Sequence, residues 1–281
     1  MNQGLSIVIP TYNRWNSLLI LLKTIIPLSR FYKISVLILD NNSSDLTQDV
    51  CAEIVKKHAH IKYFRNHVNI GMELNILRAL SLANTSHVWC IGDDDELSVD
   101  ILDLFYKHGY MKNILSSDAT FIINHLFGAQ ADGNQFFFQD FAKFAKHFFL
   151  SDFEVLTGIT WISGVIVKKS LINASTGILS LNQNFVHTHS YLSSIINSKG
   201  NIMVIPQKLV KEQKLKMSRS KDSESYLDQT FQRSLHNILI KIAKECHIEC
   251  NMNYEKYIQK ISLRYSVPPS ILIKGERPWS Y

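Results

Sequence analysis

The sequence predicts an α/β protein built on a doubly wound, mostly parallel sheet. Two observations lead to this prediction: short β-branched runs alternate with segments of helical length, and polar or glycine-containing loops follow the runs. The chain has 281 residues, 46% of them hydrophobic, so it can bury a sizeable core. In such sheets the loops after the strands meet at one edge, where ligands bind. We therefore expect functional residues directly after the predicted strands.

Four strands are predicted in the first hundred residues, with three helices between them as crossovers. Pro27 is expected to end the first helix, because proline lacks the N–H that a helix interior needs. The strands are expected at residues 5–10, 34–40, 61–66 and 87–92. The helices are expected at 15–26, from a cap within 43–45 to about residue 58, and at 70–85.

Beyond residue 110 the patterns are weaker but still alternate. A strand and a turn are expected within 158–172, a helix at 185–198 and a strand at 201–206. Apolar residues then recur at helical spacing between about 223 and 246. The α/β pattern thus extends past the first hundred residues and gives way to a helical C-terminal region.

The net charge of +6 lies in the C-terminal part of the chain. Residues 1–198 hold 15 basic and 16 acidic residues, whereas residues 199–281 hold 15 basic and 8 acidic ones. A basic tail suits an anionic partner such as phospholipid headgroups or a pyrophosphate, or forms a solvated lysine-rich face. The sequence contains no known nucleic-acid recognition motif, so nucleic acid is not an expected partner.

The N-terminus has neither the basic region nor the cleavage site of a signal peptide, and no apolar run could span a bilayer. We therefore expect a cytoplasmic protein. Phe141, Phe144, Phe148 and Phe149 recur at helical spacing with basic residues between them. Such a helix either rests on a membrane interface or packs on the protein's own core. The first alternative predicts peripheral contact with the inner face of the cell membrane.

Four contiguous acids, Asp93, Asp94, Asp95 and Glu96, follow the fourth predicted strand. A helix cap or a solvated loop would need only one or two of these acids. A bound divalent cation would explain three contiguous ones, because it would offset their mutual repulsion. Mn²⁺ and Mg²⁺ take carboxylate oxygens together with substrate phosphates. The sequence has no G-x-x-x-x-G-K-[ST] loop, and no G-x-G-x-x-G follows the first strand. A bound diphosphate would therefore be held by metal and side chains.

Four segments in order, LSIVIPTYNR, VLILDNNSSD, NIGMELN and GDDDEL, resemble the signature of family 2 glycosyltransferases with the GT-A fold. The GDDD form is similar to bacterial surface-polysaccharide sugar transferases of the abequosyltransferase type. The resemblance implies transfer of a sugar from a nucleotide-diphosphate donor to a saccharide acceptor, with Mn²⁺ or Mg²⁺ as cofactor. It also implies a GT-A domain at 1–220, with a nucleotide-binding half at 1–110 and an acceptor-binding half at 111–220. The basic helical region would then be 221–281.

The resemblance implies a donor site at the ends of the first three strands. Tyr12 could stack on the base or pack in the core, and Asp40 could bind the base or ribose or cap the next helix. Asn69, Gly71 and Asn75 match an N-x-G-x-x-x-N pattern beside the donor. The full set of implied donor-binding residues is Pro10, Thr11, Tyr12, Arg14, Asp40, Asn42, Asn69, Gly71, Asn75 and Asp93.

The family pattern D-x-D-D has its first aspartate where this chain has Gly92. Asp93 and Asp95 can still form a D-x-D motif, or the alignment can be fixed on Leu97, which makes Asp94 the central metal ligand. We expect Asp94 as the first metal ligand and Asp95 as the second, while Asp93 faces the ribose or base. Glu96 is expected at a solvated helix start. A basic stretch at 208–221 could close over the donor or form a solvated linker.

The acidic pair that supplies the general base in inverting members is missing, which leaves the stereochemistry open. His187 and His189 stand in its place, as a base, a third metal ligand or ordinary surface histidines. Asp152 and Glu154 are other possible bases. Trp161 could stack on an acceptor sugar or pack in the core, and the acceptor itself is expected to be lipid-linked.

Two alternatives remain. A degenerate, non-catalytic nucleotide-sugar or glycan-binding protein would explain the missing acidic pair. A nucleotidyltransferase could share a similar sheet, but it relies on a glycine-rich first loop, and PTYNRWN has no glycine.

Overall fold

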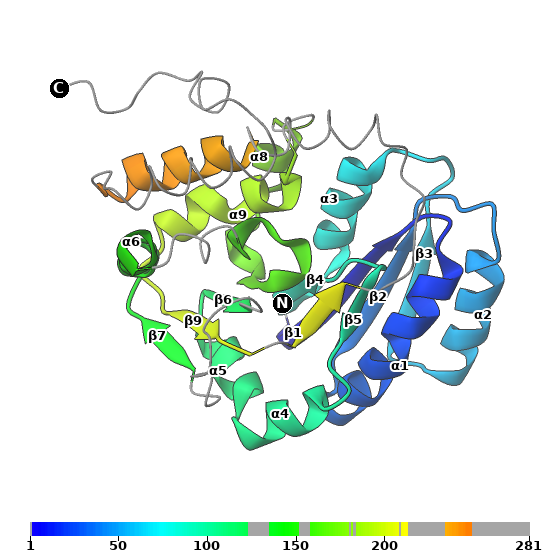
Figure 1. The fold of residues 1–281 in the computed structure, drawn as a ribbon. Helices are drawn as coiled ribbons and strands as arrows, with labels where there is room; N and C mark the ends of the chain where they lie inside the picture. The colour runs from blue at the N-terminus through cyan, green and yellow to red at the C-terminus, as the bar shows by residue number, and fades with distance from the viewer. Residues whose placement is uncertain are drawn as a thin grey trace.

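The computed structural model describes residues 2–122, 135–151, 158–179, 181, 184–207, 209–212 and 234–248. Its first half alternates strands and helices as the sequence predicts (Figure 1). The elements are β1 (Asn2–Thr11), α1 (Trp15–Tyr32), β2 (Ser35–Asp40), α2 (Thr47–Lys57), β3 (Ile61–Arg65), α3 (Met72–Leu82), β4 (Thr85–Cys90), β5 (Asp95–Leu97), α4 (Ile101–Lys107) and α5 (Tyr110–Ser116).

The second half adds further helices and shorter strands, most of which join the same sheet. Its elements are β6 (Ala119–Ile122), β7 (Phe136–Phe138), α6 (Phe141–Ser151), η1 (Gly158–Thr160), η2 (Ile162–Gly164), β8 (Val165–Lys168), η3 (Lys169–Leu171), α8 (Ala174–Ile178), α9 (Val186–Ile196), β9 (Ile202–Ile205) and β10 (Val210–Glu212). A further helix occupies 234–245.

The main sheet has the strand order β3-β2-β1-β4-β8-β6-β9-β7 among the described residues. The four strands from β3 to β4 are mutually parallel, β8 is antiparallel to both of its neighbours, and β7 is antiparallel to β9. This confirms the predicted mostly parallel, doubly wound architecture. The parallel half brings the ends of β1, β2 and β4 to one edge, and these strands carry the candidate donor residues.

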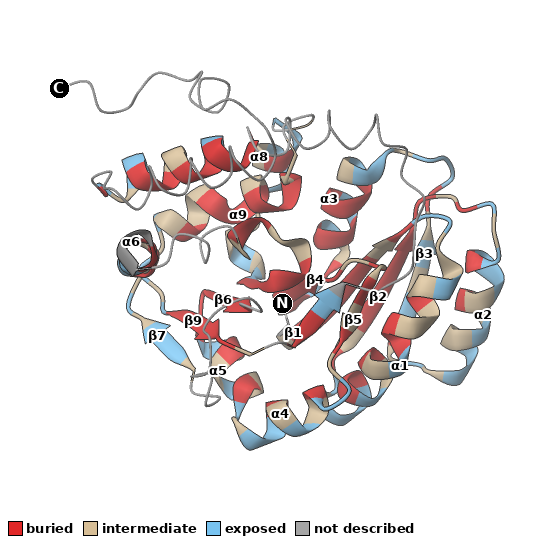
Figure 2. Ribbon diagram, viewed as in Figure 1, coloured by how far each residue is buried: buried red, intermediate tan, exposed pale blue. Residues whose placement is uncertain are grey.

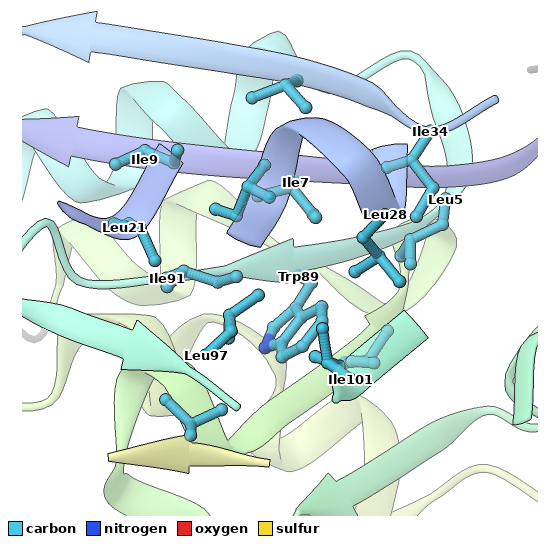
Figure 3. Close-up of a cluster of buried hydrophobic side chains, with 14 of the residues drawn as sticks. Leu5, Ile7, Ile9, Leu21, Leu28, Ile34, Trp89, Ile91, Leu97 and Ile101 are labelled. Carbon is cyan, nitrogen blue, oxygen red and sulfur yellow. The ribbon is translucent and has the colours of Figure 1, made fainter. Parts of the chain in front are cut away.

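Successive residues of β1 face opposite sides of the sheet, as strand geometry requires. Ile7 and Ile9 join a cluster that also contains Trp89 and residues of α1 and α4, whereas Val8 joins residues of α3 on the other face. Figure 3 shows Trp89 among Leu28, Leu97 and other members of the first cluster. Figure 2 shows buried residues concentrated in the strands and on the inward sides of the helices. Burial on both faces explains why these strands are continuous apolar runs.

The prediction that Pro27 ends the first helix is wrong, because α1 continues through it to Tyr32. Pro27 itself is exposed, whereas Ile25 and Leu28 on either side of it are fully buried. The burial of these flanking residues offsets the one hydrogen bond that a proline removes. The helix ends instead at Lys33, whose left-handed backbone returns its N–H to the Ser29 carbonyl.

The phenylalanine stripe at 141–149 forms α6 and faces inward. Phe141, Phe144 and Phe148 are buried in one cluster with residues of α9, β9 and the 234–245 helix. The Phe121 and Phe144 rings stack at 4.7 Å between centroids. These rings are core residues, so the core-packing alternative is confirmed for them and the membrane alternative is wrong. The side chain of Phe149 lies outside the described residues. No helix in the described ranges has the length and hydropathy to cross a bilayer.

Candidate functional site

The loops after β1, β2 and β4 are held together by backbone hydrogen bonds at one edge of the sheet. Thr11 and Asp40 are register partners at the ends of β1 and β2. The Asn41 N–H donates to the Thr11 carbonyl at 2.9 Å, and the Ile91 N–H donates to the Val8 carbonyl at 3.0 Å. Three segments far apart in sequence therefore line one site, where doubly wound sheets bind ligands.

An arginine from the first loop pairs with the acidic turn. Arg14 Nη1 donates to Asp93 Oδ1 at 3.0 Å and to Asp94 Oδ2 at 2.8 Å. Asp93 is only 4% exposed and also accepts from Thr11 Oγ1 at 2.7 Å. Burial raises the pKa of Asp93, and the Arg14 charge and the Thr11 hydrogen bond oppose that shift. Asp93 is thus held by the protein, with little surface left for the ribose or base contact that we expected.

Asp94 is the accessible acid of the three, with a side chain 41% exposed. Asp93, Asp94 and Asp95 carry three formal negative charges and Arg14 one positive charge, so the group has a net formal charge of −2. One divalent cation would neutralise it. Hard oxygen donors of this kind suit Mn²⁺ or Mg²⁺.

Gly92 leaves a space between two of these carboxylates. A Cβ atom on Gly92 would lie 3.0 Å from Asp94 Oδ1 and 3.0 Å from Asp95 Oδ2. An aspartate here, as in the usual family pattern, would crowd both groups. Glycine avoids this crowding of Asp94 and Asp95, whose carboxylates are donors of the kind that a divalent cation takes together with substrate phosphates.

Asp95 is buried at the start of β5 and is held from the second half of the chain. Its Oδ2 accepts from Ser163 Oγ, and it is only 5% exposed. Glu96 lies in the same strand, where β5 pairs antiparallel with β10 and Lys211 Nζ approaches Glu96 Oε1 at 3.2 Å. The expectation of a solvated helix start at Glu96 is therefore wrong. Of the basic stretch at 208–221, residues 209–212 are described, and they pair with the acidic turn's strand.

Asp40 is fully buried, and its carboxylate faces protein groups. Oδ1 accepts from the Ser43 N–H at 2.8 Å and from Ser43 Oγ at 2.5 Å. Oδ2 accepts from the Tyr63 hydroxyl at 2.6 Å and lies 3.5 Å from Arg65 Nε. A direct contact of Asp40 with base or ribose would therefore require one of these partners to move. Asp40 instead fixes the loop that follows β2, close to the capping alternative.

A chain of asparagines connects this loop to the start of α3. Asn41 donates to Asn69 Oδ1 at 2.7 Å, and Asn66 donates to Asn41 at 2.8 Å and to Asn75 at 2.9 Å. Asn75 is buried and donates to the Leu39 carbonyl, so the structure gives it a structural contact rather than an exposed one. Asn69 is exposed. Asn41 and Asn66 were missed from the sequence, although both follow a strand directly, which was the available signal.

The remaining donor candidates divide by exposure. Tyr12 is 43% exposed, so the core-packing alternative for it is wrong. Pro10 is half-buried beside it. Asn42 has a positive φ of 66° and accepts from Arg65 Nη2 at 2.8 Å. Gly71 has φ 85°, and a Cβ added there would meet nothing within 4 Å, so backbone conformation rather than space favours glycine.

The two histidines lie on α9 and do not join the acidic turn. His187 is 8% exposed, and its Nε2 lies 2.9 Å from the Thr160 carbonyl, which makes it the donor in that pair. Burial lowers the pKa of His187 to about 4, so it is a weak base near neutral pH. Burial also lowers the pKa of His189, as does Lys241.

These facts bear on the three roles expected for the histidines, as a base, a third metal ligand or ordinary surface residues. His187 is a core residue rather than a surface one, and His189 is half-buried. Within the ranges that the structure describes, no three His, Cys, Asp or Glu side chains gather to hold a metal, so a third ligand of this kind is not found there. Asp152 and Glu154 lie outside those ranges.

Trp161 lies between η1 and η2, two residues from the serine that holds Asp95. It is half-buried, packs against the Trp89 cluster, and its ring occupies the space that a Cβ on Gly164 would need. Its partial exposure is compatible with both of its expected roles.

Comparisons with known proteins define the class. Residues 6–126 match the family model described as Glycosyl transferase family 2. The mannosyltransferase PcManGT of Pyrobaculum calidifontis, in complex with GDP-Man and Mn²⁺, superimposes with a TM-score of 0.56 at 12% identity, covering 97% of this chain and 86% of that one. S. aureus TarS 1–349 gives 0.55 at 14% identity, covering 94% and 71%. The chain therefore shares the GT-A fold of these two glycosyltransferases, and its residues 6–126 resemble family 2.

Within that class the sequence resembles one particular protein. Abequosyltransferase RfbV of Salmonella typhimurium is 36% identical over 107 residues, covering 37% of this chain and 32% of the relative. The expected resemblance to an abequosyltransferase is confirmed. The match spans about a third of the relative's length, so its substrate is not assigned to this chain by similarity alone.

Proposed function

We propose that this protein is a glycosyltransferase that moves a sugar from a nucleotide-diphosphate donor to a saccharide acceptor. The main support is the acidic turn, residues 92–95 after β4, which Arg14 holds beside the loops after β1 and β2. Similar structures support the donor class: TarS 1–349 has been solved in complex with UDP, with a TM-score of 0.51, and PcManGT with GDP-Man.

We further propose that Mn²⁺ or Mg²⁺ binds at Asp94, with Asp95 as the second carboxylate. When bound, such a cation would hold the two phosphates and stabilise the charge of the leaving nucleoside diphosphate. Arg14 neutralises the buried Asp93 and leaves the turn with a net formal charge of −2. The loops after β1 and β3, with the exposed Tyr12 and Asn69, are proposed to orient the nucleotide together with the loop after β2.

The acceptor that we propose is a lipid-linked saccharide in bacterial surface-polysaccharide assembly, such as lipopolysaccharide, O-antigen or capsule, at the inner face of the cell membrane. Similarity to a protein named abequosyltransferase supports a glycan acceptor. The excess of basic residues after residue 198 supports contact with anionic lipid headgroups. Trp161, which is half-buried, is the proposed platform for an acceptor sugar.

One observation favours a second candidate, a non-catalytic protein that binds a nucleotide-sugar. His187 is buried against the Thr160 carbonyl, and no other described residue stands out as a general base. Such a protein would keep the acidic turn but would not turn over its ligand.

Release of nucleoside diphosphate separates the two candidates. The protein is incubated with UDP-, GDP-, CDP- and dTDP-sugars and Mn²⁺, and the free diphosphate is measured. The transferase predicts slow release from one donor class, at least about 100-fold weaker in Asp94→Asn and unchanged in Asp49→Asn, an exposed acid on α2. Binding of a nucleotide-sugar without any release would support the non-catalytic candidate.

A further inference from the structure

One buried serine connects the acidic turn to the second half of the chain. Ser163 is 0% exposed, its hydroxyl accepts from the Gly92 N–H at 2.9 Å, and the same hydroxyl donates to Asp95 Oδ2. Its carbonyl accepts from Trp89 Nε1 at 2.9 Å. A single residue thus contacts the last part of β4 and both ends of the acidic turn.

The acidic turn is closed at those same two ends. The Asp95 N–H donates to the Gly92 carbonyl at 3.1 Å, so residues 92–95 form one tight turn. Asp93 and Asp94 occupy its two central positions. Fixing the amide of Gly92 and the side chain of Asp95 therefore fixes the direction in which Asp94 leaves the backbone.

The segment that carries Ser163 is itself fixed by α9. The Tyr191 hydroxyl and Thr188 Oγ1 both donate to the Ile159 carbonyl, at 2.8 and 3.2 Å. His187 Nε2 holds the neighbouring Thr160 carbonyl. Gly164 closes the segment, since a Cβ there would lie 3.0 Å from the Trp161 ring. Side-chain hydrogen bonds therefore join α9 to residues 159 and 160, and the short backbone segment from there to Ser163 joins them to the acidic turn.

We infer that Ser163 is a positioning residue for the cation and diphosphate, and that segment 158–164 couples the α9 side of the protein to the acidic turn. The inference rests on the proposed function, because it assigns Ser163 a role in that same site. Residues that orient metal ligands from behind matter nearly as much as the ligands, and their loss typically costs 10- to 100-fold in metal affinity.

The test compares Ser163→Ala with Ser6→Ala. Ser6 is also 0% exposed, and its hydroxyl forms a 2.7 Å hydrogen bond with Thr85 Oγ1. This bond does not involve the acidic turn, so Ser6→Ala controls for the loss of a buried hydroxyl. Mn²⁺ affinity is measured by electron paramagnetic resonance with UDP, GDP or CDP present. Ser163→Ala is expected to weaken Mn²⁺ binding at least about 10-fold, whereas Ser6→Ala stays within about twofold of the wild type.

Hydrogen–deuterium exchange of residues 91–97 is the second measurement. The Gly92 amide loses its acceptor in Ser163→Ala, so exchange there is expected to accelerate in that variant and not in Ser6→Ala. Wild-type Mn²⁺ affinity in Ser163→Ala would overturn the inference, as would unchanged exchange. A wild type that binds none of the nucleotides with Mn²⁺ would overturn the proposed function itself, while faster exchange in Ser163→Ala would still support the positioning of the turn.

Discussion

The Arg14 guanidinium lies 3.0 Å from the buried Asp93 carboxylate, although the two residues are 79 positions apart in sequence. The same nitrogen reaches the half-exposed Asp94. This pair answers how the chain tolerates contiguous acids at one strand end. A buried carboxylate is costly unless it is paired and hydrogen-bonded, and Arg14 and Thr11 provide both.

Removing Arg14 should therefore destabilise the fold through Asp93. We expect Arg14→Gln to lower the free energy of unfolding by roughly 2–3 kcal/mol, because a buried charge loses its partner. In an Asp93→Asn background the same substitution should cost much less. Urea unfolding of the four proteins in this double-mutant cycle measures the coupling, and strictly additive effects would contradict the pairing.

Filling the space at Gly92 should disturb Asp94 more than the fold. Gly92→Ala places a Cβ 3.0 Å from the Asp94 and Asp95 carboxylates, and Asp94 is the one with room to move. We expect about 10-fold weaker Mn²⁺ binding, with a loss of roughly 1 kcal/mol in stability. Gly109→Ala is a poor control because of its positive φ, so Gly200→Ala, whose Cβ would crowd the Asp118 carboxylate instead, is the matched variant. Equal Mn²⁺ affinity in both variants would argue against the proposed cation position.

Asp40 should matter for stability before it matters for binding. Asp40→Asn presents an amide or a weaker acceptor to the Ser43 N–H and the Tyr63 hydroxyl, so we expect a loss of about 2 kcal/mol. Tyr63→Phe, which removes one donor to the same carboxylate, should cost a similar amount. Thermal and urea unfolding measure both. If Asp40→Asn unfolded like the wild type but lost nucleotide binding, the direct contact first expected from the sequence would be correct.

The buried His187 should make stability fall in acid. Its folded pKa is about 4, below the ordinary value of 6.5, so the unfolded chain binds the proton first as pH falls. The neutral, buried His187 therefore contributes fully to the free energy of unfolding above pH 6.5. This contribution is lost as pH falls toward 4, and the loss amounts to about 2 kcal/mol at pH 5. His187→Gln should show a smaller loss of unfolding free energy between pH 7.5 and pH 5 by about that amount. Equal slopes for the two proteins would show that His187 is not buried in its neutral form.

The strands of the first half were predictable because burial on both faces of the sheet requires continuous apolar runs. The acids after β4 were predictable as a candidate site because they directly follow such a run. Their partners were not. Arg14 and Ser163 reach the turn across 79 and 68 positions, and no local pattern encodes that contact. The burial of His187 was not predictable for a related reason: the sequence places the histidines at a helix start but does not tell which face of α9 meets the core. The prediction that Pro27 ends the first helix was wrong because the burial of neighbouring residues in the core outweighed the helix-breaking tendency of proline.

Calorimetric titration of UDP, GDP and CDP, with and without Mn²⁺, tests whether the acidic turn binds a nucleoside diphosphate through a divalent cation. The account predicts that Mn²⁺ tightens binding of at least one nucleotide by about 10-fold or more in the wild type, and that Asp94→Asn loses this gain while remaining folded. Nucleotide affinity that is indifferent to both Mn²⁺ and Mg²⁺, together with an Asp94→Asn variant that binds like the wild type, would contradict it.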